Sequence, residues 1–306
     1  MKTKLLRQFA LCAALMAGIC SAAHSAAIGL HAGHDDSTSQ YDDFGTWLGK
    51  PVMYRVTFAA ADTWGSIAAP YILSVGTKPW LASNPSRVEV ITIPLMPDPS
   101  GTDPRTAANI AADDAMLAAI AKGTYDNYFR ELAQNLATKT GAPQRIIVRL
   151  GWELNGDWYT WNALHAPATY AAAYRHVVQT MRSVCNVLRF EWNLSRTGRT
   201  LDWNAAYPGD DVVGGTLGLT AFRQFAQAHN KFEAYTEWSV STSAAGHGDD
   251  TAFVQGMHDW IVAGGARVLY HGYWNTSAGG PNGAIQGPGS GLVPNSAALY
   301  KKLFGQ

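Results

Sequence analysis

Two glutamates, Glu153 and Glu237, stand in tryptophan-rich surroundings that suit chemistry on sugars. Glu153 lies between Trp152 and Trp158, and Glu237 is followed directly by Trp238. Cleavage of a glycosidic bond needs one carboxyl group to protonate the departing oxygen and a second to attack the anomeric carbon or to activate water. Flat indole rings stack well on the apolar faces of sugar rings. These residue types predict glycoside hydrolysis, with Glu153 and Glu237 as the catalytic pair.

Other charged residues near these glutamates need a role as well. Glu191 and Glu233 are rivals of Glu237, but Glu233 comes early in its expected strand and Glu191 is expected deeper inside. Arg149 is four residues before Glu153, so strand alternation places it on the same inward face. A buried arginine requires a carboxylate or several hydrogen-bond acceptors. We therefore expect Arg149 to pair with Glu191 or Glu237, in a supporting role.

The elements that position these residues follow from an alternation of short β-branched or aromatic runs with longer helical segments, which is typical of a parallel α/β fold. The expected strands are 27–31, 52–58, 88–95, 145–151, 187–193, 212–217, 232–238 and 266–272. The expected helices are two within 107–140, separated near Gly123, and one each at 167–184, 249–262 and 296–304. Glycines in the sixth strand make it the weakest of the eight.

Eight strands with their helices predict a single (β/α)₈ barrel over residues 26–306. A doubly wound sheet is the runner-up, although the glycine fingerprint that often follows its first strand is missing. Active sites of such barrels lie at the C-terminal ends of the strands. Residues at those ends are the expected substrate contacts: Asn155, Trp158, Tyr159, Trp161, Asn193, Trp238, His271 and Trp274. Trp152 is expected to turn away from the barrel centre, because Glu153 beside it points inward.

The N-terminal residues 1–25 have the pattern of a secretory signal peptide. Lys2, Lys4 and Arg7 precede an apolar run, and small residues suited to cleavage follow it. We therefore expect a secreted or periplasmic protein, of the Gram-negative kind, with no membrane span. Cys185 would be the one cysteine left after cleavage, so no intrachain disulfide is expected.

Composition narrows the classes of partner. Lysine plus arginine and aspartate plus glutamate both total 23, and no basic block interrupts the chain, so a nucleic-acid partner is not expected. His31 and His34 with Asp35 and Asp36 resemble metal ligands only weakly, and sugar contacts or plain loop polarity are the preferred interpretation. Two carboxyl groups suffice for the chemistry, so we expect no cofactor and no metal. The expected partner is a polysaccharide or oligosaccharide, bound by a monomer.

One segment carries a specific family resemblance. Its shared features are an arginine four residues before a glutamate, an Asn-Gly pair and a cluster of aromatic residues: Arg149, Glu153, Asn155, Gly156, Trp158, Tyr159 and Trp161. This segment resembles the acid/base motif of glycoside hydrolase family 26, known chiefly for β-mannanases. Further similar segments follow in order at 167–175, 190–193, 207–211 and 236–238. The resemblance implies a barrel, a retaining mechanism, Glu153 as acid/base and Glu237 as nucleophile.

Two departures from the family pattern leave the substrate open. Trp152 stands where the family usually has histidine, and residues 212–219 lack the aspartate and aromatic residue that usually follow Asp211. The expected substrate is therefore a β-linked polysaccharide, either mannan-like or a bacterial exopolysaccharide, attacked within the chain. The alternative is a glycan-binding barrel that has lost catalysis.

Overall fold

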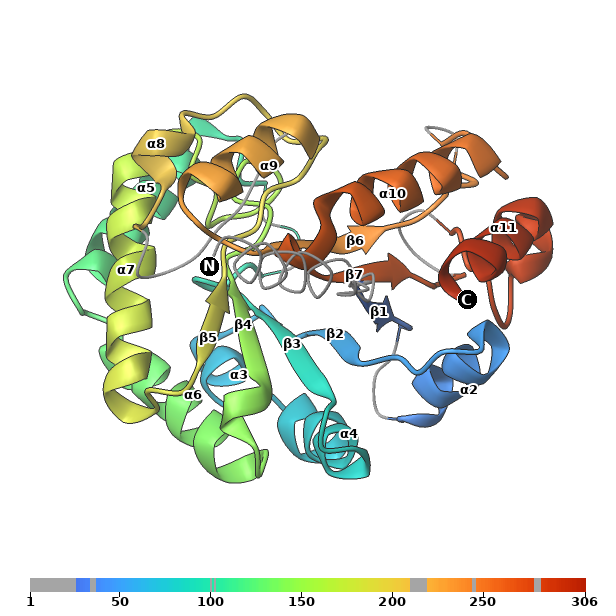
Figure 1. Ribbon diagram of the computed structural model, residues 1–306. Helices are drawn as coiled ribbons and strands as arrows, with labels where there is room; N and C mark the ends of the chain where they lie inside the picture. Colours follow the sequence, from blue (N-terminus) through green and yellow to red (C-terminus); the bar gives the residue numbers. More distant parts are fainter. Residues whose placement is uncertain are drawn as a thin grey trace, which may run out of the picture.

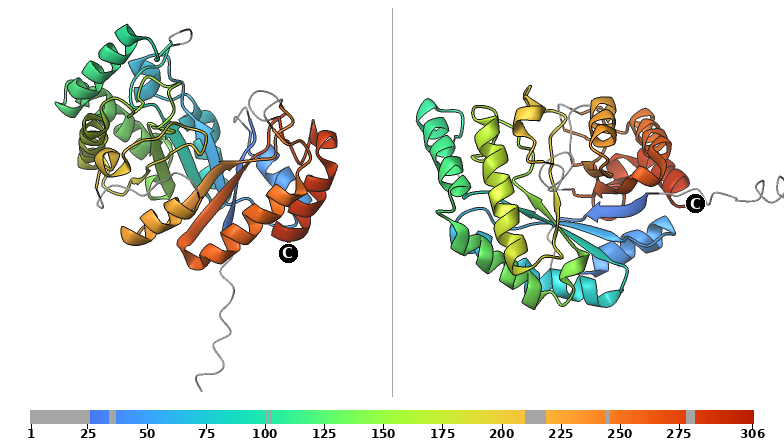
Figure 2. Two further views of the ribbon diagram at one scale, coloured as in Figure 1. Left: turned by 90° about the horizontal axis from the view of Figure 1, so that it is seen from above. Right: turned by 60° about the vertical axis from the view of Figure 1, so that its left-hand side comes forward.

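The computed structural model describes residues 26–33, 37–99, 101, 103–209, 219–243, 246–277 and 282–306. These residues form one curled, fully parallel sheet in the order β5-β4-β3-β2-β1-β7-β6 (Figures 1 and 2). Its strands are β1 (Ala27–His31), β2 (Tyr54–Phe58), β3 (Val88–Ile93), β4 (Ile146–Leu150), β5 (Arg189–Glu191), β6 (Glu233–Trp238) and β7 (Val268–Trp274).

Helices cover the outer side of the curled sheet (Figure 1). The first half contributes α2 (Ser39–Leu48), α3 (Trp64–Ala68), α4 (Lys78–Ser83), α5 (Ala107–Ala121) and α6 (Asp126–Lys139). The second half contributes α7 (Pro167–Val184), α8 (Trp203–Ala206), α9 (Leu219–Ala228), α10 (Thr251–Gly264) and α11 (Pro294–Phe304). A strand followed by a returning helix buries both faces of a parallel strand, which explains the near-continuous burial of β3 and β4.

Seven of the eight expected strands are confirmed, as are the helix pair around Gly123 and the helices that begin at Pro167, Thr251 and Pro294. The sixth expected strand, 212–217, lies outside the described residues, as do the signal peptide 1–25, His34, Asp35, Asp36, Asp210 and Asp211. The described sheet is a curled seven-stranded half-barrel with edges at β5 and β6. The strand expected between these edges is not among the described residues, so the closed eight-stranded barrel stays a prediction.

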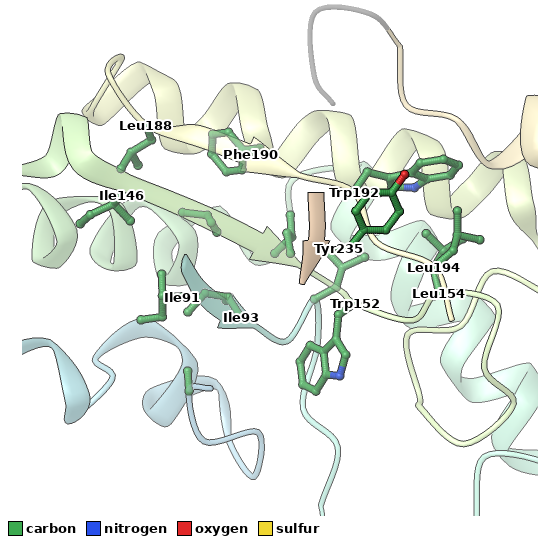
Figure 3. Close-up of a cluster of buried hydrophobic side chains, with 14 of the residues drawn as sticks. Ile91, Ile93, Ile146, Trp152, Leu154, Leu188, Phe190, Trp192, Leu194 and Tyr235 are labelled. Atoms are coloured by element: carbon green, nitrogen blue, oxygen red, sulfur yellow. The ribbon is translucent and has the colours of Figure 1, made fainter. Parts of the chain in front are cut away.

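The two faces of the sheet have separate cores. The inner face holds a small cluster, in which Tyr54, Val56, Val90 and Ile147 surround Tyr270. The outer face holds the large cluster between sheet and helices, of which Figure 3 shows the part near β4, β5 and β6. No helix in the described part of the chain is long and apolar enough to cross a membrane.

Candidate active site

Arg149 lies at the centre of the polar group on the inner face. Its guanidinium is fully buried, and Nε donates a hydrogen bond to Glu191 Oε1 at 3.1 Å. Nη1 donates to Glu237 Oε1 from the other side. The expectation that Arg149 points inward and pairs with a carboxylate is confirmed, and it binds both candidates. Strands β4, β5 and β6 are thereby connected through one side chain.

The charges of this group act on one another. Burial alone would lower the pKa of the Arg149 guanidinium, but the carboxylates of Glu237 and Glu191 hold that pKa above its usual range. Burial raises the pKa of the Glu237 carboxyl; the Arg149 charge opposes this, whereas the charges of Glu153 and Glu191 add to it. Glu153 is therefore close enough to Glu237 for their charges to interact. Arg149 is the group that favours the ionised form of Glu237 against these effects.

A β-bulge turns Glu237 toward Arg149. Tyr235 pairs with His271 and Trp238 pairs with Tyr273, so β6 has two residues where β7 has one between these pairs. Strict alternation would have put Glu237 on the same face as Tyr235, which packs outward against Phe222. The bulge instead lets Tyr235 and Trp238 both face outward while Glu237 reaches the inner face. It re-aims the side chain that the proposed chemistry needs most.

Glu153 follows β4 in an uncommon backbone conformation. Its φ is 48°, in the left-handed region that residues other than glycine seldom adopt. Its backbone N–H donates to Asn193 Oδ1 at 3.0 Å, and Trp158 Nε1 donates to its Oε2 at 3.0 Å. Such conformations cluster at functional sites, where the surroundings hold them in place. Asn193 and Trp158 therefore lie beside Glu153, as expected, but both bind the glutamate itself.

Aromatic rings form the other side of this region. Phe58, at the end of β2, lies 5.9 Å below the Arg149 guanidinium carbon and packs edge-on against Trp152 and Trp274. Trp152 is buried, and its Nε1 donates to the Tyr159 hydroxyl at 2.9 Å. Trp274 stacks on His31 with ring centres 4.0 Å apart. Tyr159 and Trp274 keep partial exposure, and Trp158 is 37% exposed, so these three can still contact a ligand.

Four expected substrate contacts are corrected by the structure. Trp161 is fully buried and donates from Nε1 to the backbone oxygen of Trp152 at 2.8 Å. Trp238 and His271 pack outward against Phe304 of α11, because neighbours in a strand point to opposite faces and Glu237 and Tyr270 take the inner one.

The fourth correction concerns Asn155. Asn155 is fully buried. Its Nδ2 donates to the backbone oxygen of Ser195 at 2.9 Å, and its Oδ1 accepts from the backbone N–H of Ser195 at 2.8 Å. None of the four corrected residues offers a surface to a sugar.

Glu233, Phe58 and Tyr270 are three further strand residues, and no sequence motif singles out the last two. Glu233 Oε2 accepts hydrogen bonds from Tyr235 (2.6 Å) and Arg223 (3.0 Å) on the outer face, so it is not a rival catalyst. Phe58 and Tyr270 both face the inner side, and the sequence signal for them is their position on alternating inward-facing strand residues. The described residues contain no group of three or more metal-ligating side chains that could hold an ion.

Known proteins share parts of this sequence and its fold. A 90-residue stretch (27% of this chain) is 37% identical to a mannan endo-1,4-beta-mannosidase of Bifidobacterium adolescentis, and a 102-residue stretch (31%) is 32% identical to endoglucanase H of Acetivibrio thermocellus. These stretches span only 9% and 11% of the two relatives. The solved structure of a GH26 β-mannanase from Bacteroides ovatus superposes with a TM-score of 0.64 at 15% identity, covering 92% of this chain and 88% of that one.

The family model described as glycosyl hydrolase family 26 matches residues 114–277, more than half of the chain. The match includes Arg149, Glu153, Glu191 and Glu237, which the structure gathers on one face of the sheet. The chain belongs to glycosyl hydrolase family 26.

Proposed function

We propose that this protein is a secreted, retaining endo-glycoside hydrolase that cleaves a β-linked polysaccharide. One observation carries the proposal: the carboxylate of Glu237 is held by buried Arg149 and lies within electrostatic reach of Glu153. A retaining mechanism needs such a pair, one ionised carboxylate and one proton donor, about 5–5.5 Å apart. The substrate is mannan-like or a bacterial exopolysaccharide.

The reaction follows two displacements. In the first, Glu153 gives its proton to the glycosidic oxygen while a Glu237 carboxylate oxygen bonds to the anomeric carbon and the C–O bond to the leaving sugar breaks. In the second, Glu153 takes a proton from water, whose oxygen displaces Glu237 from the same carbon. The product keeps the β configuration. Arg149 favours the first step because it stabilises Glu237 as the carboxylate.

Two structural parts of this proposal concern residues outside the described ones. Residues 212–217 are the sixth expected strand in chain order, which would bring the sheet to eight strands and close the barrel between β5 and β6. Residues 1–25 are proposed to be a signal peptide that export removes. N-terminal sequencing of the exported protein tests the second point, and we expect it to begin at residue 26.

The roles of the two glutamates are separated by azide rescue on an aryl β-glycoside. Glu237→Ala removes the nucleophile, so turnover is abolished, and any azide product is the α-anomer formed by direct displacement. Glu153→Ala spares the first step on a good leaving group, and azide then yields the β-glycosyl azide. Glu131→Ala, an exposed glutamate of α6, is the matched control and keeps full activity. The reverse pattern of anomers would overturn the assignment.

A glycan-binding barrel without catalysis is the second candidate, and Trp152 in place of the family's histidine favours it. A reducing-sugar assay over a polysaccharide panel separates the two candidates. The panel includes β-mannan and β-glucan, because the two relatives found are named a mannan endo-1,4-beta-mannosidase and an endoglucanase. New reducing ends support the hydrolase, whereas binding without any reducing ends supports the binding barrel.

A further inference from the structure

We propose that Tyr270 acts as a positioning residue: by occupying one oxygen of Glu191, it keeps the Arg149 guanidinium shared between Glu191 and the Glu237 carboxylate. The inference rests on the proposed function, in which Glu237 is the nucleophile. Neither Tyr270 nor Glu191 needs to contact the sugar. The effect of Tyr270 reaches Glu237 through Glu191 and Arg149, whereas the Glu191 charge also acts on Glu237 directly.

Glu191 is held at three points. Its Oε2 accepts a hydrogen bond from the Tyr270 hydroxyl at 2.8 Å, and its Oε1 accepts one from Arg149 Nε at 3.1 Å. Its backbone oxygen accepts a third from the Tyr174 hydroxyl at 2.9 Å. Both carboxylate oxygens are thus occupied, and the side chain is only 12% exposed. A carboxylate held in this way is a fixed support for the guanidinium on its far side.

Tyr270 is itself fixed by the inner core. Its ring stacks on Tyr54 with centres 4.3 Å apart and planes 5° from parallel, and it is fully buried. Gly29 on the neighbouring strand leaves the necessary space, because a Cβ there would lie 2.9 Å from Tyr270 Cδ2. The hydroxyl therefore has one direction, toward Glu191. The inner core of β1, β2 and β7 in this way sets the position of a group on β4.

The arrangement shares one positive charge between two carboxylates. Among the described residues, Glu153 and Tyr159 also interact electrostatically with Glu237. The hydrogen bond from Tyr270 satisfies one Glu191 oxygen and leaves only the other for Arg149. Without that hydroxyl, Glu191 draws Arg149 toward itself with both oxygens, and Glu237 loses part of its partner. Without the Glu191 charge, the Arg149 guanidinium forms an ion pair with Glu237 only.

Two substitutions should therefore move the Glu237 titration in opposite directions. In Tyr270→Phe the pKa of Glu237 rises, and in Glu191→Gln it falls, each by about half a unit or more. The direct readout is ¹³C NMR of the labelled glutamate carboxyl carbons, with Glu237→Gln identifying the resonance. The second readout is the acid limb of kcat/KM on β-mannan or β-glucan, which follows the same group. We expect kcat to fall about tenfold in Tyr270→Phe with KM nearly unchanged.

Tyr300→Phe is the matched control. Tyr300 is also a fully buried tyrosine, but it lies in the outer layer on α11 and its hydroxyl has no hydrogen-bond partner. It should leave both the titration and the acid limb unchanged. Opposite shifts in the two test variants establish the inference.

An unmoved Glu237 titration in folded Tyr270→Phe and Glu191→Gln overturns it, as do shifts of the same sign. If Tyr270→Phe does not fold, Glu191→Gln keeps the inference falsifiable, because a Glu237 pKa that stays unchanged or rises in that variant contradicts it. A wild type that cleaves no polysaccharide would count against the proposed function, and the NMR titration would still decide the positioning role.

Discussion

Both faces of β6 and β7 carry side chains with polar atoms, but side chains that are neighbours in the sequence differ in whether those atoms have polar partners. On the inner face, Glu237 and Tyr270 each bind a charged partner, and that partner connects them to β4 and β5. On the outer face, Trp238 and His271 are packed against α11, and the nitrogens of their rings have no hydrogen-bond partner. The same strands therefore supply both a polar site and an apolar support for it. Proximity to a catalytic residue in the sequence does not place a side chain in the site.

The largest expected effect comes from removing the centre of the inner face. Arg149→Met leaves the partly buried carboxyl groups of Glu237 and Glu191 without a cation, so the pKa of Glu237 rises further and the proposed nucleophile is lost. We expect kcat to fall by about a hundredfold to a thousandfold and the free energy of unfolding to fall by about 3–5 kcal/mol. Enzyme assays and urea titration measure the two effects. The exposed Arg130, whose bond to Asp126 is on the surface, gives the control Arg130→Met with little change in either.

The outer face should break in a different way. Trp238→Ala removes an indole that is only 7% exposed and leaves a cavity among Phe253, Tyr300 and Phe304. We expect a loss of about 3–5 kcal/mol in the free energy of unfolding. Oligosaccharide affinity of the folded fraction, measured by calorimetry, should stay at the wild-type value. A loss of affinity with unchanged stability would mean that Trp238 faces the substrate after all.

His271 makes the outer layer sensitive to acid. Burial, with a smaller effect of His258, lowers the pKa of His271 from 6.5 to about 3. The folded protein thus keeps it neutral, whereas the unfolded chain binds a proton below its ordinary pKa. His271 costs no stability above about pH 6.5. Below that pH the free energy of unfolding falls progressively as the pH approaches 3, and the loss is roughly 3 kcal/mol at pH 4. His271→Phe should flatten the dependence of Tm on pH in this window, and the exposed His165→Gln should not.

The smallest effects belong to the exposed aromatic residues near Glu153. Trp158→Ala removes an indole that is partly exposed and bound to Glu153, so oligosaccharide binding should weaken several-fold, or about 1 kcal/mol, while Tm changes little. Tyr159→Phe keeps the ring but removes the hydroxyl that accepts from Trp152. We expect an effect of about 1 kcal/mol or less on binding. Titration calorimetry resolves both, and an unchanged affinity in Trp158→Ala would exclude it as a sugar contact.

Much of this site follows from the sequence because strand periodicity is a local property. The side chains of β4 alternate between the two faces of the sheet. This alternation predicts that Arg149 lies inside with a carboxylate partner, and the structure confirms it. The strands before and after it also lie within a few residues of their expected bounds. A run of buried, β-branched residues predicts both the strand and its inward face.

The remaining features depend on departures from that periodicity. The bulge in β6 separates Glu237 from Trp238, and the left-handed backbone of Glu153 ends the alternation after β4. The two bulge residues, 236 and 237, include no glycine, and Gly151, which has a positive φ two residues before Glu153, does not by itself predict the conformation of Glu153. Two adjacent aromatic or charged residues at a strand end then look equally suited to a ligand. The sequence therefore predicts the wrong face for Trp238 and His271. Only their packing partners distinguish them.

The contact between Asn155 and Ser195 has a consequence for how readily the site can change. The Asn155 amide makes two hydrogen bonds to backbone atoms of Ser195 and one to the backbone oxygen of Arg199, so the loop after β5 is held without regard to the side chains at those positions. Gly198 is the constrained position instead, because a Cβ there would collide with the Asn155 amide. Asn193, just before the fastening, carries the hydrogen bond to Glu153. A library that varies the exposed residues 196 and 197 and keeps Gly198 can therefore change this loop while the contact between Asn193 and Glu153 is kept.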